Sequence, residues 1–215
     1  MLLVDDDPLV RTGLSMILSS TGDIEVVAEA GDGDEAVPKV TMHAPDVVLM
    51  DIRMRRMNGL TATAAVTALP NPPKVLVLTT YDLDEYVFDA LGAGASGFLL
   101  KEGSPQEIID AVRVVAAGEA MLSPRTTRKL IGHFVATRTS PRRHRARAGL
   151  GTLTERERQI VTAVAQGGTN AEIGAELHLS EATVKTHITR IFAKLDATNR
   201  VQLTIFAYEA GLVAP

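Results

Sequence analysis

The sequence predicts an α/β fold with a five-stranded, doubly wound parallel sheet, followed by a small all-α helix-turn-helix domain. Short runs of β-favouring residues without polar alternation recur through residues 1–120, which is typical of parallel strands buried on both faces. Helical stretches lie between these runs, so the crossovers place helices on both faces of the sheet. From Leu153 onward the pattern is helical throughout.

Five strands alternate with five helices in the first part of the chain. Strands are expected at 2–4, 25–28, 46–50, 74–78 and 97–100, and helices at about 8–19, 34–43, 59–68, 84–93 and 105–117. Asp7 and Ser104 each precede a proline, so each can cap a helix, and Glu107 completes a capping box with Ser104. Pro38 falls inside the second helix and should kink it or end its first turn.

Charged residues directly follow three of these strands. Asp5 and Asp6 follow the first strand, Asp51 the third and Lys101 the fifth. The carboxyl ends of parallel strands meet at one edge of the sheet, where ligands bind. Carboxylates brought together there repel one another unless a cation shares the space, and Mg²⁺ is a hard ion that takes oxygen ligands. We therefore expect an active site with Mg²⁺ at this edge.

Composition narrows the class of protein. The chain has 215 residues, which suits two small domains, and 46% hydrophobic residues, enough to build their cores. No apolar run approaches the roughly 18 residues of a membrane span, and no basic signal segment is present at the N-terminus. The absence of cysteine excludes disulfides, thiolate nucleophiles and cysteine-type zinc sites. We expect a cytoplasmic protein without a membrane partner.

Charge is distributed unevenly along the chain. Residues 1–120 carry 8 Lys and Arg against 19 Asp and Glu, residues 121–150 carry 8 against none, and residues 151–215 carry 6 against 7. We predict a first domain at 1–120, a helical and basic linker at 121–150 with a helix from 123 to about 136, and a second domain at 151–215. The linker is either a solvated tether or an attractor of DNA phosphates, and the sequence favours neither.

Four helices are expected in the second domain, and most have a recognisable start. They lie at about 155–166, 170–177, 181–195 and 199–210, with capping signals at Thr154 and Glu157, Thr169 and Glu172, Ser180, and Asn199 and Gln202. Only residues 178–180 separate the second helix from the third. This is the tight connection of a helix-turn-helix, whose later helix enters the major groove of DNA.

The third of these helices has two distinct faces. The apolar face consists of Val184, Ile188, Ile191 and Leu195, and the opposite face of Lys185, Thr186, Thr189 and Arg190. These polar side chains suit base edges and phosphates, and we add Lys194 and Arg200 as candidate DNA contacts. A solvated helix face is the simpler interpretation, but the preceding short helix and tight turn favour DNA binding.

At this point several segments resemble a known family. Residues 2–8, 47–54, 78–82 and 94–101 resemble the receiver domain of two-component response regulators, which has a flavodoxin-like fold. Residues 153–157 and 180–187 resemble the LuxR-type DNA-binding domain. Their order and spacing match the NarL/FixJ subfamily. The resemblance implies a transcriptional regulator rather than an enzyme, controlled by phosphoryl transfer from a sensor histidine kinase.

The resemblance also implies roles for individual residues. Asp51 would accept the phosphoryl group and Lys101 would pair with it. Asp6 and Asp51 would ligate Mg²⁺ directly together with the backbone carbonyl of Arg53, whereas Asp5 would act mainly through water. Asp7 is more consistent with a helix cap than with a metal ligand.

Further implied residues concern switching and assembly. Thr79 would hydrogen-bond the phosphoryl group, and Phe98 occupies the aromatic switch position. A phosphorylated homodimer would bind double-stranded promoter DNA, with Val201, Ile205 and Tyr208 as candidate dimer contacts. The sequence leaves open whether receivers pair through their first and fifth helices or near the fourth.

Two departures from the family pattern concern this site. Arg55 stands where the family usually has a proline, and Asp7 where this subfamily often has a histidine.

Two other functions remain open from the sequence. An aspartyl-phosphate phosphatase also uses a strand-end aspartate with Mg²⁺, but it would need an acid two residues after the nucleophile, where this chain has Arg53. That interpretation would also leave the helix-turn-helix unexplained. Alternatively, the regulator responds to a ligand or a partner protein and ignores phosphorylation.

Overall fold

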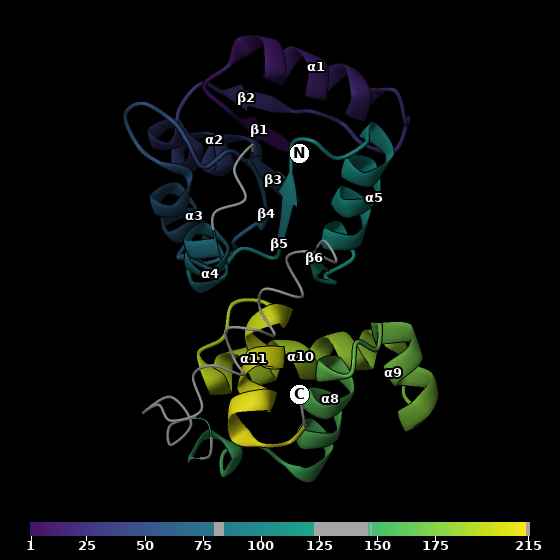
Figure 1. Ribbon diagram of the computed structural model, residues 1–215. Helices are drawn as coiled ribbons and strands as arrows, with labels where there is room; N and C mark the ends of the chain where they lie inside the picture. Colours follow the sequence, from purple (N-terminus) through teal and green to yellow (C-terminus); the bar gives the residue numbers. More distant parts are fainter. Residues whose placement is uncertain (80–83, 123–145, 147, 214–215) are drawn as a thin grey trace. The chain divides into compact units, whose positions relative to one another are not determined.

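The computed structural model describes residues 1–79, 84–122, 146 and 148–213 (Figure 1). The chain divides into two compact units, Met1–Thr127 and Arg128–Pro215. Most of the predicted linker, including its expected helix, lies outside the described residues, as do residues 80–82 of the receiver-like segments. Among the described helices, none is long and apolar enough to cross a membrane.

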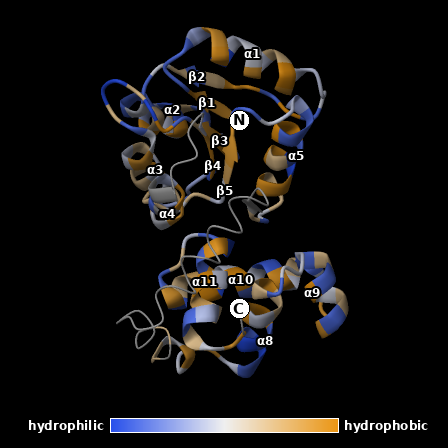
Figure 2. Cartoon of the chain, in the orientation of Figure 1, coloured by the Kyte–Doolittle hydropathy of each residue, from blue (hydrophilic) through white to orange (hydrophobic). Residues whose placement is uncertain are grey.

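A parallel sheet forms the centre of the first unit. Its strands are β1 (Leu2–Val4), β2 (Ala28–Ala30), β3 (Val47–Met50), β4 (Lys74–Thr79), β5 (Gly97–Leu100) and β6 (Met121–Leu122), in the order β2-β1-β3-β4-β5-β6. All described pairings are parallel. The predicted five-stranded doubly wound sheet is confirmed, and the two-residue β6 extends one edge. Figure 2 shows the strands as predominantly hydrophobic, as expected of strands covered on both faces.

Helices cover both faces of this sheet (Figure 1). They are α1 (Pro8–Ser19), α2 (Ala36–His43), α3 (Gly59–Thr67), α4 (Asp84–Gly92) and α5 (Pro105–Ala116). Side chains from α1 and α5, among them Leu18 and Val112, form one core with Leu49 of the sheet. The predicted helix at 34–43 is divided, because a 3-10 turn at Gly33–Glu35 precedes α2. Pro38 then lies in the first turn of α2, where backbone N–H groups have no hydrogen-bond partner within the helix, so the missing N–H of proline costs no helical hydrogen bond.

Strand β2 differs from the prediction at 25–28 and begins three residues later. It pairs only with β1 within the described sheet, and its register matches Leu2 with Ala28 and Val4 with Ala30. Val26, inside the predicted strand, and Ile24 just before it pack against the core without joining this ladder. Because β2 ends at Ala30, residues 31–35 follow its carboxyl end directly.

The four helices predicted in the second domain are present, and each end agrees with the prediction to within one residue. They are α8 (Glu155–Ala165), α9 (Asn170–Leu177), α10 (Glu181–Leu195) and α11 (Arg200–Ala210). The capping boxes at Thr154 and Thr169 are confirmed, and Ser180 caps α10. Asn199 caps α11, but the Gln202 side chain accepts from the N–H of Thr198 rather than completing the expected box.

The turn between α9 and α10 depends on a glycine. His178 adopts a left-handed conformation with φ of 55°, and the N–H of Leu179 donates to the carbonyl of Gly174. A Cβ atom at Gly174 would lie 2.8 Å from the carbonyl oxygen of Leu179. The predicted three-residue connection is confirmed, and only glycine at 174 lets it pass this close to α9.

Candidate functional site

Three carboxylates meet at the carboxyl edge of the sheet. Asp5 follows β1 and Asp51 follows β3, and these two strands are neighbours in the sheet. The helices that follow them, α1 and α3, lie on opposite faces of the sheet. Parallel sheets bind ligands at the point where the chain changes face in this way. The N–H of Asp51 donates to the carbonyl of Val4 over 2.8 Å and fixes the two strand ends together. One oxygen each from Asp5, Asp6 and Asp51 lies within 4.8 Å of the others.

Lys101 reaches this cluster from the end of β5. Its Nζ lies 2.5 Å from Oδ2 of Asp5 and 3.2 Å from Oδ1 of Asp51. The backbone N–H of Lys101 donates to the carbonyl of Thr79, which ties the ends of β4 and β5 together. Burial alone would lower the pKa of Lys101, but the two carboxylates raise it above its ordinary value. Lys101 therefore stays charged at neutral pH.

The Asp51 carboxyl is a weaker acid than an ordinary aspartate. Its pKa is raised from 3.8 to about 6, chiefly because the carboxyl is buried and additionally because Asp5 repels its charge, while Lys101 acts in the opposite direction. Lys101 contacts two of the three carboxylates, and Asp6 is accompanied by the solvent-exposed guanidinium of Arg55, whose charge is screened by water. A further cation fits this excess of negative charge, and a set of carboxylate oxygens is the donor set that Mg²⁺ prefers.

Two residues that the sequence analysis missed shape the loop after Asp51. Gly59 closes the base of the loop, because its N–H donates to the carbonyl of Ile52 over 2.8 Å. A Cβ at Gly59 would lie 1.9 Å from the carbonyl oxygen of Asp51, so any larger residue would displace the loop. Asp32 holds the far part of the loop through the N–H groups of Arg56 and Met57. The rule that polar residues follow strand ends would have found Asp32 if β2 had been placed correctly.

The remaining predicted receiver residues lie at or near the same edge. Thr79 is the last residue of β4 and is buried, and Phe98 in β5 is fully buried. Asp7 caps α1 by accepting from the N–H of Leu9, as predicted. Arg53 follows Asp51 by two residues on the exposed surface, and Nε of Arg55 lies 3.5 Å from Oδ2 of Asp6.

Helix α10 presents the polar face that its sequence predicts. Val184, Ile188 and Ile191 are buried. The exposed residues are Lys185, Thr186, Thr189 and Arg190. Within this face Lys185 pairs with Glu181 over 2.9 Å on the surface, an interaction that contributes little and can be exchanged for another anion.

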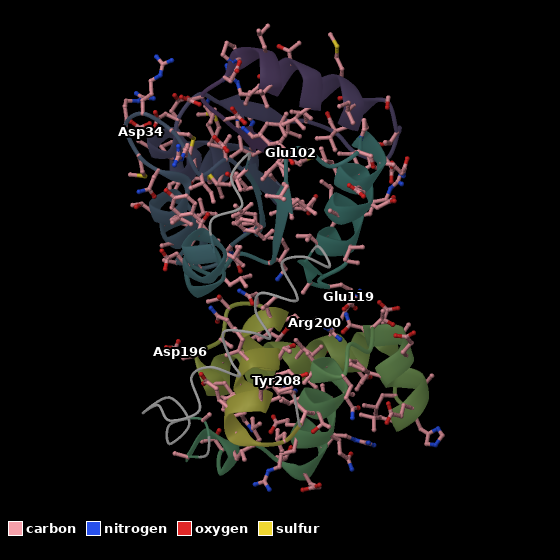
Figure 3. All side chains as sticks on the ribbon, viewed as in Figure 1. Asp34, Glu102, Glu119, Asp196, Arg200 and Tyr208 are labelled. Carbon is pink, nitrogen blue, oxygen red and sulfur yellow. The ribbon has the colours of Figure 1, made fainter. Side chains whose placement is uncertain are left out.

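Lys194 and Arg200 make contacts inside the second unit. Nζ of Lys194 lies 2.7 Å from Oε2 of the buried Glu157. Arg200 is only 7% exposed, and its guanidinium donates to Oδ1 of Asn170 over 2.8 Å and to the carbonyl of Gly168. Figure 3 shows Arg200 at the start of α11. Because this side chain is drawn into the domain, the structure does not support an exposed phosphate contact at Arg200.

The three candidate dimer residues on α11 differ in exposure. Val201 is 5% exposed, whereas Ile205 and Tyr208 are partly exposed. Of the three, Val201 is therefore the least accessible to a second chain.

Two family models match the chain, one within each of the two compact units. Residues 1–113 match the response regulator receiver domain, and residues 151–207 match the luxR family of bacterial regulatory proteins. The chain is 40% identical to transcriptional regulatory protein LiaR of Bacillus subtilis (strain 168) over 214 residues, covering 99% of this chain and 98% of LiaR. It is 38% identical to response regulator protein VraR of Staphylococcus aureus (strain Mu3 / ATCC 700698) over 213 residues, covering 99% and 97%. Among solved structures, response regulator ChrA of a heme-sensing two-component system is 37% identical, covers 99% of this chain and 97% of its own, and superposes with a TM-score of 0.52.

Proposed function

The chain belongs to the DNA-binding transcriptional response regulators of two-component systems, with a receiver domain and a LuxR-type DNA-binding domain, and we propose that phosphorylation of Asp51 switches it. It is a transcriptional regulator and not an enzyme, so the phosphatase interpretation is set aside. The observation that carries the proposal is the convergence of Asp51 with Asp5, Asp6 and Lys101 in one cluster, in which Asp5 and Asp51 are buried. A phosphohistidine of a sensor kinase is the proposed donor.

The proposed reaction is a single group transfer. A carboxylate oxygen of Asp51 attacks the phosphorus in line, the new O–P bond forms as the N–P bond of the donor breaks, and the histidine nitrogen leaves with the bonding electrons. Lys101, already beside Asp51, neutralises charge on the phosphoryl oxygens. Thr79, at the end of the adjacent strand, is the proposed hydrogen-bond donor to the phosphoryl group.

Mg²⁺ is the proposed cofactor of this transfer. Asp6 and Asp51 would hold it together with the backbone carbonyl of Arg53, while Asp5 remains engaged with Lys101. When bound, the ion supplies positive charge to the phosphoryl oxygens. A divalent ion fits this site because Lys101 is shared by Asp5 and Asp51 and the exposed Arg55 near Asp6 compensates little charge, so the cluster stays negative.

Phosphorylation changes the charge and the hydrogen-bonding capacity of the pocket. The acyl phosphate replaces one carboxylate charge by a group with up to two charges and three acceptor oxygens. We propose that this change acts through Thr79 and Phe98, whose side chains shift in response. It then favours a homodimer whose α10 helices bind a two-fold promoter site.

The direct test of the proposed switch uses a small phosphodonor. Wild type and Asp51→Asn are incubated with acetyl phosphate and Mg²⁺, and intact mass and binding to promoter fragments are measured on the same samples. We expect one phosphoryl group and tighter DNA binding for wild type only. DNA binding that is equal in both proteins with and without the donor would instead favour a regulator that responds to a ligand or partner.

The proposed DNA contacts are tested on α10. Lys185→Ala should weaken the free energy of binding by about 1–3 kcal/mol on the preferred DNA duplex and by less on a random duplex, because base-edge contacts carry sequence discrimination. Arg190→Ala should weaken binding to both duplexes by a similar amount and should reduce the salt dependence of binding. Equal losses on both duplexes for both variants would contradict this division of roles.

A further inference from the structure

The loop between β3 and α3 carries the proposed metal-binding carbonyl but has no proline to stiffen it. Residues 52–58 read Ile-Arg-Met-Arg-Arg-Met-Asn. At its base the loop is closed by Gly59, whose backbone packs directly on Asp51. The Arg53 carbonyl lies inside the loop, one residue beyond Ile52, and the loop needs a second point of attachment if this carbonyl is to hold one position. Rigid placement of such groups is what metal binding requires of a protein loop.

Asp32 provides this second attachment. It lies two residues beyond β2 and is only 3% exposed. Oδ2 accepts from the N–H of Arg56 over 2.9 Å, and Oδ1 accepts from the N–H groups of Met57 and Gly33, both over 2.8 Å. A buried carboxylate is retained only when it is compensated in this way. Burial alone would raise the pKa of Asp32, but these donors hold it below its ordinary value.

Two further contacts show how closely the two loops fit. A Cβ at Gly33 would lie 2.5 Å from the carbonyl oxygen of Met57, so the backbones of the β2–α2 and β3–α3 loops touch. The guanidinium of Arg56 also lies 3.6 Å from Asp32, 3.0 Å from Asp34 and 2.8 Å from Glu35. Arg56 is largely exposed, so these ion pairs contribute less than the buried hydrogen bonds.

We propose that Asp32 is a positioning residue for the phosphorylation site: by fixing the N–H groups of Arg56 and Met57 it holds the Arg53 carbonyl where a divalent cation can bind beside Asp51. This inference rests on the proposed function. Along the chain, Arg53–Arg55 lies between Ile52, which Gly59 holds at the base of the loop, and residues 56–57, which Asp32 holds at its far side. Its carbonyl groups therefore keep their direction although the loop contains no proline.

The test compares Asp32→Asn with Asp34→Asn in the full chain. An asparagine at 32 retains the shape and one acceptor, but its amide N–H₂ replaces one carboxylate oxygen and leaves one of the backbone donors unpaired. Asp34 also pairs with Arg56 but is exposed, at the outer edge of the first unit (Figure 3), and so controls for the ion pair. Mg²⁺ affinity is measured by titration calorimetry, and exchange of the amides of residues 53–58 by mass spectrometry. The phosphorylation rate with acetyl phosphate is measured across Mg²⁺ concentrations.

We expect Asp32→Asn to weaken Mg²⁺ binding about tenfold, in the range seen when groups that support metal ligands are removed. The Mg²⁺ concentration for half-maximal phosphorylation should rise by the same factor, while the maximal rate changes little. Amide exchange in the loop should become faster, and Asp34→Asn should match wild type. Asp32→Ala should show the same changes more strongly, and Asp32→Asn carries the test if the alanine variant does not fold.

The inference is overturned if Asp32→Asn binds Mg²⁺ as tightly as wild type while its loop amides exchange faster, because the loop would then be loosened without consequence for the site. It is also overturned if Asp34→Asn causes the same loss. Wild type that neither binds Mg²⁺ nor accepts a phosphoryl group at Asp51 would instead refute the proposed function itself. The two failures are therefore distinguishable.

Discussion

Each unit contains a buried carboxylate beside a lysine, and the two pairs behave in opposite ways. In the first unit Lys101 lies 3.2 Å from Asp51, yet the pKa of Asp51 is raised to about 6. In the second unit Lys194 lies 2.7 Å from Glu157, and the pKa of Glu157 is lowered to about 2. The residue types are alike, so their surroundings must decide the difference.

The surroundings differ in the balance of charge and donors. Burial raises the pKa at both sites. At Glu157 that effect is outweighed by Lys194 and by the N–H and hydroxyl of Thr154, which belong to the capping box of α8. At Asp51 the effect of burial prevails, because Lys101 is shared with Asp5 and the charge of Asp5 also raises the pKa of Asp51. A balanced pair fixes a helix, whereas an unbalanced one leaves a carboxylate available for chemistry and for a second cation.

The largest difference should appear when each lysine is removed. Lys101→Met should slow phosphorylation by acetyl phosphate about 100-fold at saturating Mg²⁺, because it deletes preorganised positive charge beside Asp51. Lys194→Met should leave this rate unchanged. Time courses of intact mass measure both rates, and a similar rate for the two variants would show that the lysines do not have separate roles.

A smaller effect concerns the stability of the second unit. Glu157→Gln should lower the free energy of unfolding by about 1–2 kcal/mol at pH 7, after allowance for solvent screening of the partly exposed Lys194. The pKa of Glu157 is lowered from 4.5 to about 2, so its stabilisation is complete above pH 4.5 and is lost as pH falls toward 2. Urea unfolding at several pH values measures the difference between wild type and variant. A difference that stayed constant down to pH 2 would exclude this origin.

The first unit should show the opposite sign. The pKa of Asp51 is raised from 3.8 to about 6, so its ionisation costs stability progressively between these values and fully above pH 6. Asp51→Asn should therefore raise the free energy of unfolding by about 1 kcal/mol at pH 7 and leave it unchanged below pH 3.8. The measurement is made with a chelator present. A variant less stable than wild type at pH 7 would show that burial beside Asp5 does not destabilise the ionised form of Asp51.

The smallest expected effect concerns Arg55. Its guanidinium lies 3.5 Å from Asp6, where it competes with a bound cation for the carboxylate. Because the side chain is 86% exposed, Arg55→Ala should tighten Mg²⁺ binding only about twofold at low salt, and the gain should vanish at high salt. Titration calorimetry at two ionic strengths measures it. Weaker binding by the variant would mean that Arg55 supports the site instead.

Local signals in the sequence predicted the elements and the centre of the site. Capping residues act on their own helix, so Ser104, Thr154 and Thr169 marked helix starts that the structure confirms. Asp51 and Lys101 could be found because each follows a strand whose apolar run is unmistakable. Convergence of these ends then follows from parallel topology alone.

The residues that were missed or misplaced depend on partners distant in the sequence. Asp32 went unnoticed because β2 is an edge strand whose limits are set by pairing with β1 rather than by its own apolar run. Arg200 was taken as a surface charge, yet its guanidinium contacts Asn170 and Gly168 at the start of α9. No local pattern reports such a contact, which arises only when the helices pack.

The most direct test of the account is to identify which aspartate of the cluster carries the phosphoryl group. After reaction with acetyl phosphate and Mg²⁺, borohydride reduction of the acyl phosphate marks the modified residue, which peptide mass spectrometry then locates. The account predicts the mark at Asp51 alone and none in Asp51→Asn. A mark at Asp5 or Asp6, or an unmarked wild-type chain, would contradict it.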